Sequence, residues 1–226
     1  METFINDPLS SSGTLRDIQI INFFVDRAEV ESLVPEQLII RDFNGKAMIS
    51  LINVINHRLS PPFFPGDPDS AYRHVAFRLL VDDAALNGGT SKGVFFLKSF
   101  TYSDIEGNDL NRFVTHGLEQ AGLLVIDNML ELSQGEKFLN YALDFHNEPQ
   151  FDEQQQLTAQ LDRAYQLDAG ELQVIKINGK RWPLKPTACY LFETNFFRSA
   201  KFAAAFRIDE KSGRQAMSYE TKRNCA

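Results

Sequence analysis

The stretch Gly93–Asp104, GVFFLKSFTYSD, has the composition of a strand that is buried on both faces. Strand pleating would place four side chains on one face, namely Val94, Phe96, Lys98 and Phe100. An ammonium group between Phe96 and Phe100 must reach solvent, pair with an anion or lose its proton. Lys98 is therefore a candidate functional residue, with a solvent-reaching or salt-bridged lysine as the structural alternative.

The preceding apolar run, YRHVAFRLLVDD over residues 72–83, predicts a second strand, and a Gly88-Gly89 turn would make the two an antiparallel pair. Alternation places His74 and Arg78 on the same face of this strand. An arginine facing inward is a suitable partner for a carboxylate ligand. The alternative is an internal ion pair with Glu193 or with Asp82.

The rest of the chain contains about twice as many strand signals as helix signals. A strand is predicted over Arg16–Val25, a short helix within 26–38, and a hairpin turn at Asn44-Gly45 that leads into a strand ending near His57. Further helices are predicted over 109–122 and 151–167, with strands over 123–132 and 137–145 and at the C-terminal end. We therefore expect an α+β fold, mainly antiparallel β, as a single domain over residues 1–226 with its core at about 15–220.

Composition and charge limit the possible partners. The 226 residues carry a net charge of -7 and contain no run of lysine and arginine, which argues against nucleic-acid and anionic-membrane surfaces. No segment reaches about 18 uninterrupted apolar residues, so we expect a soluble cytoplasmic protein. The 19 phenylalanines favour an apolar interior that is shared between the core and an internal cavity.

Strong sequence motifs for cofactors or metals are absent. The chain has no dinucleotide-binding, P-loop, nucleophile-elbow or zinc-protease motif, and its two cysteines and four histidines lack metal-ligand spacing. We expect no cofactor and no metal, and a small-molecule ligand as the partner.

Several runs together resemble a known family: VPEQLIIRDFNGKAMISLINVINHRLSPPF, FRLLV, GGTSKGVFFLKSF, RWPLKP and a final strand ending at SYET. This order is similar to that of the YqjF-like family of uncharacterised bacterial proteins, which groups with the acetoacetate decarboxylases in one fold superfamily. The resemblance covers about Leu15 to Glu220. It implies a barrel or cone-shaped antiparallel sheet around an internal cavity, with a few flanking helices.

The resemblance also assigns individual positions. Arg78 stands where the family keeps an arginine, and Trp182-Pro183-Leu184 matches its WPL-like segment. His74 stands where the family has glutamate, and Lys98 and Phe100 replace serine and aspartate. True acetoacetate decarboxylases form a Schiff base through a Lys-Lys pair on a later strand, but the corresponding residues 117–132 contain no lysine. The resemblance therefore implies changed pocket chemistry.

These observations favour a protein that binds a small organic molecule, such as a carboxylate held by Arg78, in a Phe-lined cavity. The expected ligand-binding residues are Arg78, His74, Phe96, Phe100, Glu193 and Trp182. A competing hypothesis is a Schiff-base enzyme that acts on a β-keto acid through Lys98, with Arg78 orienting the carboxylate and Glu193 or His74 moving protons. The third hypothesis is a non-catalytic protein that acts through a surface or as a homo-oligomer.

Overall fold

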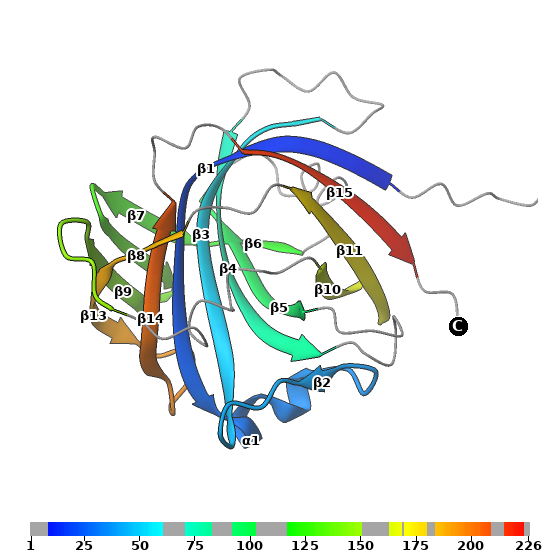
Figure 1. Ribbon diagram of the computed structural model, residues 1–226, viewed down its shortest axis with the longest axis horizontal. Coiled ribbons are helices and arrows are strands. Elements are labelled where there is room, and N and C mark those ends of the chain that lie inside the picture. Colours follow the sequence, from blue (N-terminus) through cyan, green and yellow to red (C-terminus); the bar gives the residue numbers. More distant parts are fainter. Residues whose placement is uncertain are drawn as a thin grey trace, which may run out of the picture.

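The computed structural model describes residues 9–60, 71–82, 92–102, 117–150, 163–168, 170–179, 184–208 and 215–223. These residues form an eleven-stranded sheet and a four-stranded sheet, with one short helix, α1 (Arg27–Val30), followed by a single 3-10 turn over Glu31–Leu33 (Figure 1). The helix falls within the predicted residues 26–38. None of the helices in these ranges is long and apolar enough to cross a membrane.

The large sheet curves into a cone-like shape (Figure 1). Its main strands are β1 (Leu9–Asp26), β3 (Lys46–Ser60), β4 (Ala71–Asp82), β5 (Lys92–Thr101), β10 (Arg163–Asp168), β11 (Glu171–Gly179) and β15 (Gln215–Arg223). The pairings lead from β1 through these strands in that order and from β15 back to β1. Shorter or flanking strands are β2 (Ile39–Ile40), β6 (Leu118–Gln120), β12 (Leu184–Pro186) and β14 (Lys201–Ile208). The expected mainly antiparallel fold is confirmed, although β5 pairs in parallel with both β10 and β6.

The small sheet consists of β7 (Gly122–Ile126), β8 (Met129–Gln134), β9 (Glu136–Asp144) and β13 (Ala188–Thr194). Its buried side chains share one apolar cluster with Phe77 of β4, so we call this side of the large sheet the Phe77 face. The opposite side is the Arg78 face. There, another cluster joins residues from β3, β4, β5, β10 and β11: Met48, Leu80, Val94, Ala164 and Ile175. These residues form a row across neighbouring strands, since Leu80 lies opposite Val94, Val94 opposite Ala164, and Ala164 opposite Ile175.

A buried polar network joins the two sheets on the Phe77 face. The Tyr141 hydroxyl donates to Gln19 Oε1 at 2.8 Å, and Asn53 Nδ2 donates to both Gln19 Oε1 and the Tyr141 oxygen at 3.0 Å. Arg73 Nη1 in turn donates to Asn53 Oδ1 at 2.8 Å. Burial raises the pKa of Tyr141 above its ordinary value, so this hydroxyl stays a donor.

The Asn44-Gly45 turn has the predicted conformation. The φ angles of Asn44 and Gly45 are 54° and 82°, and Phe43 pairs with Lys46 across them. Two consecutive positive φ angles are typical of the tight turns that match the twist of paired strands, and asparagine and glycine adopt them at low cost.

Three predicted elements are wrong in part. Leu118–Gln120 and Arg163–Asp168 are strands, although they fall at the ends of the predicted helices over 109–122 and 151–167. The remaining residues of those helices up to 116 and 162 lie outside the described residues. Residues 123–132 form not one strand but most of the β7–β8 hairpin, which turns at Asp127 with a φ angle of 50°. Both segments form strands because they pair with β5. The local sequence pattern, on which the helix predictions rest, does not show this pairing.

The predicted alternation of side chains along β5 is wrong, because the strand contains a β-bulge. Phe77 lies opposite Lys98, but the next residue of β4, Arg78, lies opposite Phe96, so Leu97 is the extra residue. A bulge shifts the alternation by one position. Lys98 therefore points to the Phe77 face and Phe96 to the Arg78 face, contrary to the expectation that they share a side.

Candidate functional site

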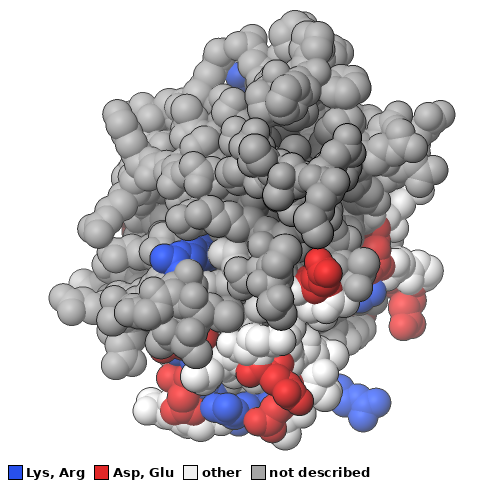
Figure 2. Space-filling view, turned by 90° about the vertical axis from the view of Figure 1, so that its right-hand side faces the viewer, with Lys and Arg blue, Asp and Glu red and all other residues white. Residues whose placement is uncertain are grey.

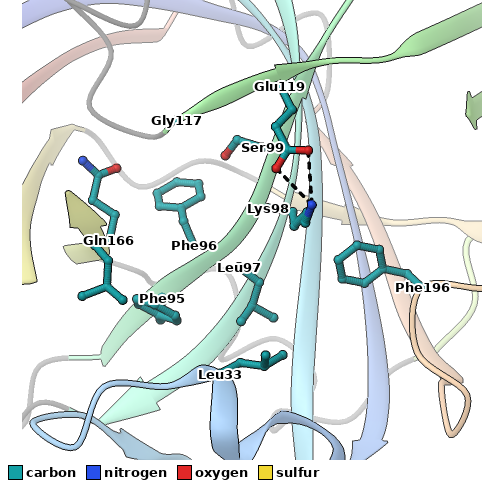
Figure 3. A pocket seen from close by; sticks show the side chains of 11 residues that line it. Leu33, Phe95, Phe96, Leu97, Lys98, Ser99, Gly117, Glu119, Gln166 and Phe196 are labelled. Atoms are coloured by element: carbon teal, nitrogen blue, oxygen red, sulfur yellow. Dashed lines mark hydrogen bonds and ion pairs between the residues drawn. The ribbon is translucent and has the colours of Figure 1, made fainter. Parts of the chain in front are cut away.

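A pocket of about 350 Å³ lies beside β5, at an interruption of the large sheet. On this edge of β5, β10 pairs with Gly93–Phe95 and β6 pairs with Ser99–Thr101. No described strand pairs with Phe96–Lys98 between them. We call this site the β5 pocket; it is lined by Leu33, residues 95–99, Gly117, Glu119, Gln166, Leu167 and Phe196 (Figure 3).

Aromatic rings form much of the pocket wall. Phe95 and Phe96 come from β5, and Phe196 comes from the segment after β13 and stacks on Phe77 with ring centroids 4.1 Å apart. The side chain of Glu29 in α1 holds this segment, because it accepts hydrogen bonds from the backbone nitrogens of residues 198 and 199 at 2.5 and 3.1 Å. Burial would raise the pKa of Glu29, but these bonds and that of the Ser199 hydroxyl outweigh it and lower the pKa.

Lys98 lies at the rim of the pocket and is paired. Its Nζ atom is 3.0 and 3.2 Å from the two carboxylate oxygens of Glu119, and the side chains are 40% and 39% exposed (Figure 3). Burial would raise the pKa of Glu119, but hydrogen bonds from Gln134 and Lys98 and the charge of Lys98 lower it. The bulge thus turns Lys98 out of the position between two phenylalanines that strict alternation predicts. The charge of Lys98 is therefore neither buried nor unpaired, although the residue lies in a strand rich in phenylalanine.

The Arg78 face carries a buried polar row next to Phe96. Asn22, Ser50, Arg78 and Phe96 lie opposite one another across β1, β3, β4 and β5. Arg78 is 6% exposed, and it donates to the Ser50 hydroxyl at 3.1 Å and to the Ser50 carbonyl at 3.4 Å. His74 is also buried, and its ring stacks on Phe96 with centroids 6.1 Å apart. The structure therefore brings together three of the predicted site residues, Arg78, His74 and Phe96, and of these three Phe96 lines the β5 pocket.

The other predicted site residues lie elsewhere. Phe100 is fully buried on the Phe77 face and contacts Phe77 edge to face, so it belongs to the core and does not line the β5 pocket. Glu193 lies in β13 of the small sheet, where it accepts a hydrogen bond from Asn195 at 2.8 Å, and it is not a lining residue. Trp182 lies outside the described residues. Within those residues, no three His, Cys, Asp or Glu side chains come together as metal ligands.

Of the lining residues, only Phe96 and Lys98 were predicted as site residues; those that were not include Ser99, Glu119, Gln166 and Phe196. The bulge moves Ser99 to the Arg78 face, and Glu119 and Gln166 belong to strands that were predicted as helix. Phe196 lies in an apolar run that the sequence assigns to the core as readily as to a pocket. The one available signal was a small polar side chain at position 99 within a strand rich in phenylalanine.

The sequence matches the family DUF2071, described as an uncharacterized conserved protein, over residues 12–222. No curated protein matches the chain in sequence.

Solved structures with a similar fold include two acetoacetate decarboxylases and a biosynthetic enzyme. One acetoacetate decarboxylase is 13% identical with a TM-score of 0.61, over 95% of this chain and 88% of the other. That of Legionella pneumophila subsp. pneumophila str. Philadelphia 1 is 12% identical with a TM-score of 0.60, over 100% and 92%. The enduracididine biosynthesis enzyme MppR, complexed with pyruvate, is 10% identical with a TM-score of 0.53, over 99% and 90%. Such identities show a common fold, so the expected acetoacetate decarboxylase-like fold is confirmed. The chain belongs to the DUF2071 family and has the acetoacetate decarboxylase-like fold.

Proposed function

We propose that this protein binds a small organic carboxylate or carbonyl compound in the β5 pocket. The observation that carries the proposal is the pocket itself, which combines a volume of about 350 Å³ with aromatic walls and a few buried polar groups. Ligand sites in proteins have volumes of roughly 300–1,000 Å³ and the same mixture of apolar walls and sparse polar groups. The volume lies at the lower end of this range and is large enough for a small organic acid.

Arg78 supports an anionic ligand group. It does not line the pocket itself, but it is buried opposite Phe96 and on the same face, so a ligand that covers the Phe96 ring would direct a carboxylate toward it. Guanidinium and carboxylate groups match in geometry and form charge-assisted hydrogen bonds. MppR, a protein of the same fold, was solved in complex with pyruvate, which is a ligand of this class.

The position of Lys98 favours binding over covalent catalysis. A Schiff base requires an unprotonated amine that faces the bound carbonyl group. Lys98 is ion-paired with Glu119, and the bulge directs Lys98 to the face opposite Arg78. Lys98 is therefore not proposed as the nucleophile that the competing hypothesis requires.

A calorimetric titration tests the proposal. The protein would be titrated with pyruvate, acetoacetate, lactate and 3-hydroxybutyrate, with acetone as an uncharged comparison. We expect saturable binding of at least one carboxylate, weakened at least tenfold in Phe196→Ala, which opens the pocket wall, and in Arg78→Gln. Arg27→Gln, which removes an exposed arginine of α1, is the matched control and should bind as the wild type does. Absence of binding by all the carboxylates, or equal binding by Phe196→Ala, would refute the proposal.

A further inference from the structure

Two buried oxygen atoms of the β5 pocket have no hydrogen-bond partner among the described parts of the chain. They are Oγ of Ser99 and Oε1 of Gln166, and their residues are only 1% and 3% exposed. The amide nitrogen of Gln166 is already used, because it donates to Gln173 Oε1 at 3.0 Å. Buried polar atoms in folded proteins are almost always paired, so two such atoms in one pocket indicate a missing partner.

The two atoms are placed to contact the same ligand. Ser99 follows the bulge of β5 and points to the Arg78 face. Gln166 comes from β10, the strand that pairs with β5 on one side of the interruption. Both residues line the pocket, and in Figure 3 the Ser99 hydroxyl and the Gln166 amide lie on either side of the Phe96 ring. A small molecule that covers this ring would reach both oxygens.

The chemistry of the two atoms restricts the ligand. A carboxamide oxygen only accepts hydrogen bonds, so Gln166 Oε1 requires a donor on the ligand, whereas the Ser99 hydroxyl both donates and accepts. A 2-oxo or 3-oxo acid anion has no O–H or N–H donor. The corresponding hydroxy acid has one hydroxyl group, which can donate to Gln166 Oε1 and accept from Ser99.

We infer that the β5 pocket selects small hydroxy acids over the corresponding oxo acids, through Ser99 and Gln166. This inference rests on the proposed function, since it assigns the ligand class of the same pocket. The carboxylate of the ligand lies toward Arg78, its carbon chain covers Phe96, and its hydroxyl group satisfies the two buried oxygens. An oxo acid of the same size fills the same space but leaves Gln166 Oε1 unpaired, which costs affinity.

Matched ligand pairs test the inference. Lactate would be compared with pyruvate, and 3-hydroxybutyrate with acetoacetate, by isothermal titration calorimetry at one pH and ionic strength. We expect at least one hydroxy acid to bind about tenfold or more tightly than its oxo partner. Ser99→Ala removes a hydroxyl group that can donate to the hydroxyl oxygen of a hydroxy acid or to the carbonyl oxygen of an oxo acid, so it should weaken the binding of both members of a pair. Ser133→Ala, which removes a more exposed hydroxyl outside the pocket, is the control and should retain the preference.

Gln166→Met provides a second variant, because it keeps the length of the side chain and removes the acceptor. It should reduce hydroxy-acid affinity and abolish most of the preference, while oxo-acid affinity changes little. Equal affinities of the wild type for hydroxy and oxo acids would overturn the inference and leave the proposed function intact. A preference that persists in Gln166→Met would also overturn it. If none of the four acids binds, the proposed function and the inference both fail.

Discussion

Replacement of Lys98 by methionine tests whether this lysine is a structural ion-pair partner or a reactive amine. The substitution keeps the length of the aliphatic chain that packs beside the pocket and removes the ammonium group. Lys98 is bonded to both oxygens of Glu119 at 3.0 and 3.2 Å, but both side chains are about two-fifths exposed. Ion pairs with this exposure contribute about 0.2–1 kcal/mol, and the bidentate geometry favours the upper half of this range.

We therefore expect Lys98→Met to lower the free energy of unfolding by about 0.5–1 kcal/mol. The assay is urea unfolding of the wild type, Lys98→Met, Glu119→Gln and the double variant, since the double-mutant cycle isolates the coupling between the two side chains. An unpaired amine buried among apolar side chains would behave in the opposite way, because its burial destabilises the fold and methionine would remove that cost. Stabilisation by Lys98→Met would therefore refute the structural role.

Chemical trapping tests independently whether Lys98 forms a Schiff base. Incubation of the protein with pyruvate or acetoacetate, followed by borohydride, converts any Schiff base into a stable adduct that mass spectrometry detects. We expect no adduct at Lys98. An adduct that forms in the wild type and is lost in Lys98→Met would contradict the ion-paired role and favour the competing enzyme hypothesis.

Three further predictions concern the framework of the site. Tyr141→Phe should lower the free energy of unfolding by about 1–2 kcal/mol, measured by urea unfolding, because it removes both hydrogen bonds of a buried hydroxyl and leaves one N–H of Asn53 unpaired; an unchanged stability would contradict the network. The pKa of Glu29 is lowered in the folded state, so its ionised form stabilises the fold above its ordinary pKa of 4.5, and this contribution is lost as the pH falls through the folded-state pKa. Glu29→Gln should therefore flatten the thermal stability profile between pH 5 and 3, and a profile as steep as that of the wild type would argue against this role. Burial raises the pKa of Cys189 to about 12, so in a Cys225→Ser background native protein should resist iodoacetamide at pH 8 and react only after unfolding; rapid labelling of the folded protein would show that the thiol is accessible.

Part of the fold and of the site follows from the sequence. Alternating apolar residues predict the β4–β5 pair, and Asn44-Gly45 predicts its tight turn, because both signals are local. The same alternation correctly places His74 and Arg78 on one face of β4. The structure adds that both side chains are buried there.

The bulge at Leu97 could not be predicted, and it decides the site. Residues 94–97 are all apolar, so either register of β5 buries apolar side chains on both faces, and no alternation in the sequence marks the shift. Gln166 was missed for a related reason. It lies in a polar segment that forms a strand because it pairs with β5, which is distant in the sequence, and with β11, which follows it. The local sequence shows neither pairing.

The described part of the surface does not present a single type of charge. On the face drawn in Figure 2, acidic and basic side chains are interspersed near the lower edge. The charged groups nearest the β5 pocket lie on different strands: Arg78 of β4 is buried on the Arg78 face, and the ion pair of Lys98 in β5 with Glu119 in β6 lies at the pocket rim.

The interruption of the sheet beside Phe96–Lys98 has a consequence for how this pocket can evolve. On that edge of β5, no described strand depends on these three residues for its register, because β10 and β6 pair only with the residues on either side. Substitutions there can change the ring, the bulge residue or the rim charge without breaking a strand pairing on that edge. Related chains could therefore diverge in ligand preference at these positions at little cost to folding.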